Sequence, residues 1–202
     1  VLRAEAAARP VLSAKVHESR NDPGFSARRF YFKSLLERLP LEKPLSKEVV
    51  DQVTRQWMVD LFPGGSALRL WSRVIPGTMG ALERFQALGL PMHVISNSDG
   101  TVEEQLIRSR LRDFFGEVID SHVVQVEKPD PVIFELSLDR TGFRPEEALY
   151  VGDMYHIDVL GAHSAGMQAV LLDPYAHWEG AFCECVPDLP ALADKFIVKE
   201  EK

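Results

Sequence analysis

The feature that most constrains this chain is a regular alternation of short apolar runs and helix-like segments after about residue 75. The apolar runs predict strands at 92–95, 117–120, 149–151 and 169–172. Helices are predicted beside them at 79–88, 102–111, 132–140 and 157–165. Strands that alternate with helices form parallel β-α-β units whose helices cover both faces of a sheet. The sequence therefore predicts an α/β fold, a Rossmann-like parallel sheet with helices on both faces.

The first 74 residues lack this alternation and have helical spacing throughout. One helix is predicted within residues 1–20, with an interruption at Pro10, and another begins after the N-cap Ser46. Between them a helix is expected to bury an apolar face formed by Phe32, Leu35, Leu36 and Leu39. The third helix has the stripe Val49, Val50, Val53, Trp57 and Leu61, and a short helix is expected through Leu68, Leu70 and Trp71. We therefore expect a helical module at 1–74 beside an α/β domain at 75–202.

Composition and charge exclude several classes of protein. Lys plus Arg number 23 and Asp plus Glu number 30, so the formal net charge is −7 and nucleic acid is not an expected partner. No apolar run approaches the roughly 20 residues that a membrane helix needs, so no membrane partner is expected. The two cysteines, Cys183 and Cys185, cannot build a disulfide framework. A cytoplasmic location is the expectation.

Polar clusters follow two of the predicted strands and the loop between them. Ser96 and Asn97 come directly after the strand at 92–95, and Asp153 and Asp158 come after the strand at 149–151. Lys128 lies in the intervening loop. Ligands of open parallel sheets collect at the carboxyl ends of the strands. Carboxylates suit Mg²⁺, whereas a fixed lysine and a serine hydroxyl suit a phosphate dianion.

These clusters, in this order, resemble motifs II, III and IV of the haloacid dehalogenase-like (HAD) hydrolase superfamily. The segment VISNSDG at 94–100 is similar to motif II, and VEKPDPVIF at 126–134 is similar to the lysine motif III. The segment LYVGDMYHIDVLGAHSAGM at 149–167 resembles motif IV. The resemblance covers about residues 75–175, and the helical module resembles a C1-type cap. It implies a HAD-like core with an α-helical cap.

The resemblance also implies an activity and roles for individual residues. The implied activity is that of a Mg²⁺-dependent phosphatase acting on small phosphorylated metabolites through an aspartyl-phosphate. Ser96 would hydrogen-bond the transferring phosphoryl group, and Lys128 would neutralise its charge. Asp153 would ligate Mg²⁺, whereas Asp158 would hold the metal's water shell or orient neighbouring groups. Asn97 would contact the leaving group or substrate.

The sequence departs from the family pattern at motif I, the DxDx[T/V] segment that carries the nucleophilic Asp. Asp22-Pro23-Gly24 and Asp99-Gly100-Thr101 are the nearest fragments, and neither has the spacing or a preceding apolar strand. We expect the nucleophile to precede Val1, on a strand that lies between those at 92–95 and 149–151. The chain as written should then be inactive alone, because both the nucleophile and the general acid/base of the family are missing.

Two alternative functions remain open. A haloacid dehalogenase needs no metal and replaces the Gly-Asp of motif IV, so Gly152-Asp153 favours the phosphatase. A catalytically inactive HAD-like binding protein is favoured by the missing motif I. It is disfavoured by the retention of Ser96, Lys128, Asp153 and Asp158 together, which no structural need requires.

Other conspicuous residues have ordinary structural interpretations. Cys183 and Cys185 supply two of the roughly four ligands of a zinc site, so a metal role is not expected. His156 is interpreted as a loop histidine with no part in proton transfer. The basic and aromatic run at 28–33 is interpreted as the solvated and buried faces of one helix. The identity of the substrate and the oligomeric state cannot be predicted from the sequence.

Overall fold

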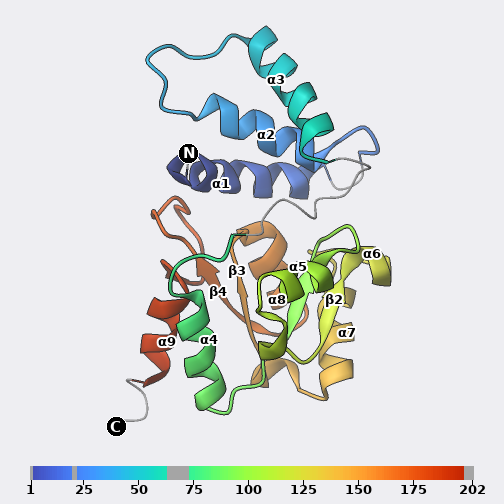
Figure 1. Ribbon diagram of the computed structural model, residues 1–202. Coiled ribbons are helices and arrows are strands. Elements are labelled where there is room, and N and C mark those ends of the chain that lie inside the picture. Colours follow the sequence, from blue (N-terminus) through green and yellow to red (C-terminus); the bar gives the residue numbers. More distant parts are fainter. Residues whose placement is uncertain (1, 20–21, 63–72, 198–202) are drawn as a thin grey trace.

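A computed structural model describes residues 2–19, 22–62 and 73–197, and Figure 1 shows its elements. The helices are α1 (Leu2–Glu18), α2 (Ala27–Glu37), α3 (Lys47–Asp60), α4 (Thr78–Ala87), α5 (Val102–Arg108), α6 (Ser121–Val124), α7 (Pro131–Thr141), α8 (Leu160–Ser164) and α9 (Leu189–Ile197). Single helical turns are η2 (Arg112–Phe114), η3 (Pro145–Glu147) and the π-helical η4 (Tyr155–Val159). The strands are β1 (Val94–Ser96), β2 (Val118–Asp120), β3 (Leu149–Gly152), β4 (Gln168–Leu172) and β5 (Glu184–Val186).

The strands pair in parallel, as the alternating pattern predicted. β1 pairs with β2, and β3 pairs with β4, which pairs in turn with β5. Within the described part of the chain these form one two-stranded and one three-stranded sheet, and no ladder joins β1 to β3. The hydroxyl of Tyr150 on β3 instead donates to the Ile95 carbonyl of β1 at 3.2 Å. The edges of β1 and β3 are therefore neighbours joined by a side chain.

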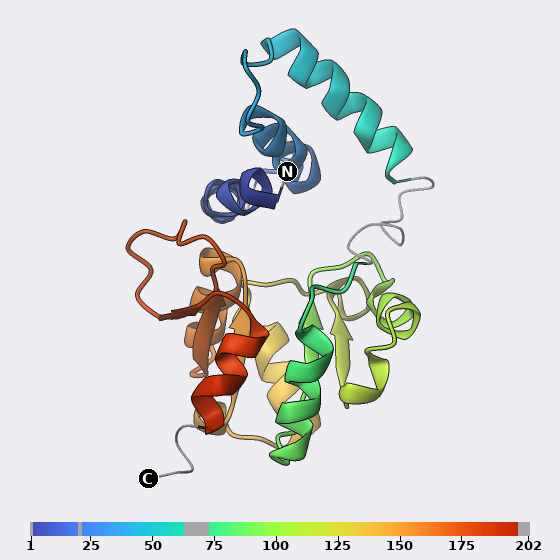
Figure 2. The ribbon, with the colours of Figure 1, turned by 60° about the vertical axis from the view of Figure 1, so that its left-hand side comes forward.

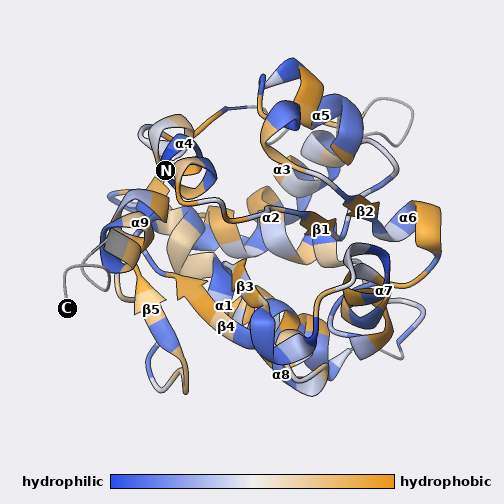
Figure 3. Cartoon of the chain, turned by 90° about the horizontal axis from the view of Figure 1, so that it is seen from below, coloured by the Kyte–Doolittle hydropathy of each residue, from blue (hydrophilic) through white to orange (hydrophobic). Residues whose placement is uncertain are grey.

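Helices cover both sides of the strands, as Figures 1 and 2 show. On one side Ile133 and Phe134 of α7 pack with Val159 and Leu171, and all four side chains are fully buried. On the other side α4 packs with α9, and Phe85 meets Phe196 edge to face at 5.7 Å. Figure 3 shows the strands β1, β2 and β4 in the colours of apolar residues. Removal of this apolar surface from water is the main force that holds the layers together.

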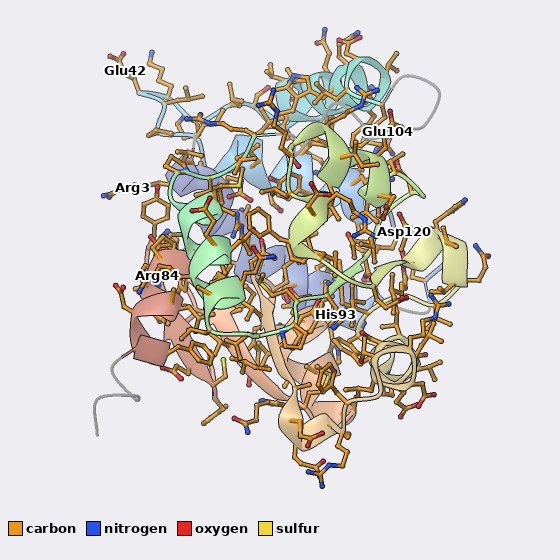
Figure 4. All side chains as sticks on the ribbon, turned by 60° about the horizontal axis from the view of Figure 1, so that its bottom comes forward. Arg3, Glu42, Arg84, His93, Glu104 and Asp120 are labelled. Atoms are coloured by element: carbon orange, nitrogen blue, oxygen red, sulfur yellow. The ribbon has the colours of Figure 1, made fainter. Side chains whose placement is uncertain are left out.

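Local signals place the helices and loops beside the strands. Asp130 caps α7 by accepting a hydrogen bond from the Val132 N–H at 3.1 Å, and α7 ends at Gly142 with a positive φ of 75°. Asp120, labelled in Figure 4, ends β2 and accepts hydrogen bonds from the N–H groups of Gly100 and Val102. This buried carboxylate fixes the loop after β1 and the start of α5.

The helices α1, α2 and α3 lie together above the carboxyl ends of the strands (Figure 1). Phe32 of α2 contacts the rings of Trp57 and Phe62 at 5.6 and 5.8 Å. No helix in the described ranges is both long and apolar enough to cross a membrane.

The structure also corrects several boundaries. The strand predicted at 92–95 begins at Val94, and the helix predicted at 157–165 begins as a π-helical turn at Tyr155. In α3 Val50 is buried, whereas Val49 is 41% exposed, so the buried face is turned from the predicted stripe. The sequence did not predict β5 or α9. The helix predicted through Leu68, Leu70 and Trp71 lies outside the described residues.

We predict that Phe134→Ala lowers the free energy of unfolding by about 3–5 kcal/mol, because it leaves a cavity in a side of the core that water does not reach. Urea denaturation measures this loss. The matched control Val132→Ala changes a residue of the same helix that is 48% exposed, and it should shift stability by about 0.5 kcal/mol or less. Equal losses for the two variants would contradict this account of the core.

Candidate functional site

A cavity of about 420 Å³ lies between the helices α1 and α2 and the carboxyl ends of β1 and β3. All five residues that the sequence predicted for the site line it: Ser96, Asn97, Lys128, Asp153 and Asp158. Ser96 ends β1, and Asp153 directly follows β3. The structure thus brings together three polar segments that lie far apart in the sequence.

Lys128 is held by a buried network. Its Nζ donates to Asp158 Oδ1 at 2.7 Å and to the Tyr150 hydroxyl at 2.8 Å. The side chains of Lys128 and Asp158 are only 11% and 4% exposed. Burial alone would lower the pKa of the Lys128 ammonium, but the contacts with Asp158 and Tyr150 raise that pKa above its usual value. Burial also raises the pKa of Tyr150, and the positive charge of Lys128 opposes this rise. Lys128 is therefore a fixed cation at the wall of the cavity.

Asn97 holds the backbone of Lys128. The Asn97 Nδ2 donates to the Lys128 carbonyl at 2.9 Å, and the Lys128 N–H donates to Asn97 Oδ1 at 2.8 Å. Both polar ends of the side chain are therefore engaged with the lysine loop. The sequence predicted a substrate contact for Asn97. The geometry shows that it joins the motif after β1 to the lysine.

Asp158 has both oxygens engaged by protein donors. Besides Lys128 at Oδ1, its Oδ2 accepts the N–H groups of Asp153 at 3.0 Å and Met154 at 2.9 Å. A Cβ at Gly152 would lie 2.4 Å from the Cβ of Asp158, so this approach requires glycine. Asp158 was predicted with Asp153 as a metal residue. Its contacts favour the other predicted role, the orientation of neighbouring groups.

Asp153 faces a cation of helix α1. Its Oδ2 lies 3.0 Å from Arg9 Nη1 of α1, and its side chain is 45% exposed to the cavity. Desolvation raises the pKa of Asp153, and the positive charge of Arg9 opposes this rise. The carboxylate is a hard oxygen donor of the kind that Mg²⁺ prefers, whereas the neighbouring guanidinium of Arg9 would compete with a cation for it. Among the described residues no group of three or more His, Cys, Asp or Glu could hold a metal.

The structure adds residues that the sequence did not single out. Arg9 forms two bonds of 2.9 Å with the carboxylate of Glu5, which also accepts the Tyr31 hydroxyl at 3.2 Å. Arg28 lies 3.4 Å from Asp99. The run at 28–33 was interpreted as the two faces of one helix, and it does lie on α2, with Phe32 buried and Arg29 exposed; the structure adds that Arg28 and Tyr31 line the cavity. No local motif marks these residues, because only the packing of α1 and α2 over the strands places them there.

His156 also joins α1 to the strands. Its backbone N–H donates to the Ser13 hydroxyl at 2.9 Å, and its ring lies 5.6 Å from that of His17. Burial lowers the pKa of His156, and His17 lowers it further. These contacts set the position of α1 above the segment that follows β3.

Comparison with known proteins gives consistent relatives. A sequence model described as haloacid dehalogenase-like hydrolase matches residues 66–172, just over half of the chain. The chain is 40% identical over 102 residues to a glyceraldehyde 3-phosphate phosphatase of Methanothermobacter thermautotrophicus, covering 50% of this chain and 45% of that protein. It is 31% identical over 151 residues to haloacid dehalogenase-like hydrolase domain-containing protein 3 of Xenopus laevis, covering 75% and 60%. The chain thus spans about half the length of the curated relatives it matches.

Solved structures share the fold. A HAD phosphatase from Thermococcus onnurineus aligns with a TM-score of 0.61 and 25% identity, covering 95% of this chain and 91% of that one. A HAD-hydrolase from Bacillus subtilis, bound to magnesium, aligns with a TM-score of 0.63 over 96% of this chain and 83% of that one. At 17% identity that second likeness concerns the fold alone.

We predict that Lys128→Met lowers the free energy of unfolding by about 3–5 kcal/mol at pH 7, because it leaves the buried Asp158 carboxylate without its cation. The pKa of Lys128 is raised in the folded protein. Its stabilising effect is therefore complete below the unfolded pKa near 10.4 and declines as the pH rises above it. The gap between wild type and variant should narrow by about 1 kcal/mol by pH 11.

Urea denaturation between pH 6 and pH 11 measures this gap. Lys195→Met removes an ammonium whose side chain is 51% exposed, and this control should stay within about 0.5 kcal/mol of wild type at neutral pH. A gap for Lys128→Met that widens above pH 10 would contradict the assigned charge pair.

Proposed function

Because the chain belongs to the haloacid dehalogenase-like hydrolase family, we propose that it acts as a phosphatase on small phosphate monoesters. The observation that carries the proposal is the fixed ammonium of Lys128, held 2.7 Å from Asp158 at the wall of a cavity that also holds Ser96 and Asp153. The named phosphatases among the relatives support this substrate class.

Lys128 and Ser96 would bind the phosphoryl group from two sides. Lys128 offers a positive charge that need not move during the reaction. Asp158 and Tyr150 hold its ammonium group, and Asn97 holds its backbone. Preorganised charges of this kind stabilise the charge that develops in a transition state more effectively than mobile ones. Ser96 would donate its hydroxyl hydrogen to a phosphoryl oxygen.

Asp153 would hold Mg²⁺ together with oxygens of the substrate. Magnesium commonly binds through one or two carboxylates and substrate phosphates and retains several waters, and the Asp153 carboxylate fits this mode. When bound, the ion would neutralise phosphate charge and orient the ester. The guanidinium of Arg9 lies 3.0 Å from Asp153 Oδ2, so it would have to move away from Asp153, toward Glu5, when the ion binds. Asp158 would position Lys128 and the turn after β3.

The nucleophilic carboxylate is proposed to lie on a further strand seated between β1 and β3. The N–H of Val94 donates to the Glu117 carbonyl at the β2 side. Because backbone polar groups alternate in direction along a strand, those of Ile95 point toward β3. Strand edges that lack a backbone partner accept a strand readily, and such a strand would replace the Tyr150 hydroxyl as the partner of the Ile95 carbonyl. A carboxylate at the end of such a strand would lie among Ser96, Lys128 and Asp153.

The helices α1–α3 are proposed to act as the cap of this enzyme, with the division near residue 74 that the sequence suggested. Their support is the position of α1 and α2, which close one wall of the cavity. A cytoplasmic location remains part of the proposal, and both cysteines, Cys183 and Cys185, are free thiols. Of the alternatives, a metal-independent dehalogenase would give Asp153 no role as a metal ligand. A purely binding protein would leave the joint presence of Ser96, Lys128, Asp153 and Asp158 at one cavity unexplained.

We predict that the full-length protein releases phosphate from small monoesters in the presence of Mg²⁺ and that Lys128→Ala lowers kcat/KM by about 10²–10³-fold. Because this change also removes a buried charge, Ser96→Ala is the second variant. It leaves the Lys128 network intact and should lower kcat/KM by about tenfold or more. Phosphate release and circular dichroism together separate lost catalysis from lost folding.

The control Lys195→Ala removes an exposed ammonium on α9 and should retain wild-type turnover. Near-normal turnover in both Lys128→Ala and Ser96→Ala, with phosphatase activity present, would show that these residues do not bind the phosphoryl group. An absence of phosphatase activity in the folded wild-type protein would contradict the proposed function itself.

A further inference from the structure

Helices α1 and α2 contribute a group of linked hydrogen bonds and ion pairs to the cavity wall. Glu5 receives three hydrogen bonds: two from Arg9, at 2.9 Å each, and one from the Tyr31 hydroxyl at 3.2 Å. Arg9 extends the set to Asp153 at 3.0 Å. We call Glu5, Arg9 and Tyr31 the Glu5 cluster. These residues line the same cavity as Lys128 and Ser96.

The charges of the whole cavity wall do not favour a second anion. Among the described lining residues there are three cations against four carboxylates, a formal net charge of −1: Arg9, Arg28 and Lys128 against Glu5, Asp99, Asp153 and Asp158. Each cation already faces a carboxylate, at 2.9, 3.4 and 2.7 Å respectively. A divalent cation at Asp153 would change the sum to +1, and the proposed nucleophilic carboxylate would return it to 0, so no positive charge remains to match even one phosphate dianion.

Hydrogen-bonding capacity indicates what the Glu5 cluster accepts instead. An ionised carboxylate has about four acceptor positions and no donor. Three donors from the described residues reach Glu5, two at Oε1 and one at Oε2, so an acceptor position remains at Oε2. A substrate hydroxyl can donate to it, whereas a substrate carboxylate or second phosphate cannot and would be repelled.

We infer that the Glu5 cluster is the specificity-determining subsite for the leaving group and selects monophosphate esters of small, uncharged, hydroxylated molecules. The inference rests on the proposed phosphatase function and narrows its substrate class. It assigns discrimination to the charge of Glu5, and it assigns Arg9 and Tyr31 the task of holding that carboxylate in place. Substrates with a carboxylate or a second phosphate near the ester should be disfavoured.

The test compares two esters of nearly equal size, glycerol 3-phosphate and 3-phosphoglycerate, which differ by a carboxylate in place of a hydroxymethyl group. With the full-length protein and Mg²⁺, kcat/KM should be at least about tenfold higher for glycerol 3-phosphate, the ratio that a difference of about 1.4 kcal/mol produces. Isothermal titration calorimetry in EDTA should give dissociation constants that differ in the same direction. Equal or reversed preferences in either measurement would overturn the inference.

Two variants isolate the charge. Glu5→Gln removes the negative charge and should reduce the preference several-fold, mainly by improving the reaction of 3-phosphoglycerate. Tyr31→Phe removes one bond to Glu5 but keeps its charge, so the preference should persist. Glu37→Gln, at the exposed end of α2, is the control and should match wild type. A preference that Glu5→Gln leaves unchanged would show that Glu5 does not determine it.

The same assay separates failure of the inference from failure of the proposed function. p-Nitrophenyl phosphate, whose leaving group carries no second acid, serves as a general phosphatase substrate. Hydrolysis of this ester without discrimination between the two glycerol derivatives would overturn the inference alone. A folded protein that hydrolyses none of the three esters would overturn the phosphatase proposal on which the inference rests.

Discussion

The Lys128–Asp158 ion pair, 2.7 Å long and almost fully buried, connects the segments that form the candidate site. One oxygen of Asp158 binds the lysine, and the other binds the backbone of Asp153 and Met154. Tyr150 extends the connection from the lysine to the Ile95 carbonyl of β1. Loss of one partner would leave the other charged in a dry environment, at a cost of about 3–5 kcal/mol. The same interaction therefore stabilises the fold and fixes the cation proposed to receive a phosphoryl group.

Two parts of the fold form the cavity wall. The ends of β1 and β3 supply Ser96 and Asp153, and the loop before α7 supplies Lys128. The helices α1 and α2 supply Glu5, Arg9 and Tyr31. In the proposed enzyme, Lys128 would bind the phosphoryl group, and the residues of α1 and α2 would select the leaving group. Because Arg9 touches Asp153 directly, the two parts are electrostatically linked, and changes in one affect the other.

Much of this arrangement could be predicted from the sequence because it depends on local patterns. Alternating apolar runs predicted the parallel strands, and the order of Ser96, Lys128 and Asp153 predicted which side chains meet at the strand ends. The roles of Arg28 and Tyr31 could not be predicted, because a helical pattern shows which residues share a face and not which cavity that face meets. The two engaged oxygens of Asp158 were also beyond prediction, since they depend on the π-helical turn at Tyr155–Val159 and on the missing side chain of Gly152.

A crystal structure of the full-length protein with bound tungstate tests the central claim most directly, because tungstate resembles phosphate in shape and its position is visible by anomalous scattering. The account predicts an oxyanion within hydrogen-bond distance, about 3 Å, of both the Lys128 ammonium and the Ser96 hydroxyl, with the Lys128–Asp158 pair still in place. An oxyanion bound elsewhere in the cavity, with Lys128 directed only toward Asp158 and Tyr150, would show that the lysine serves the fold alone.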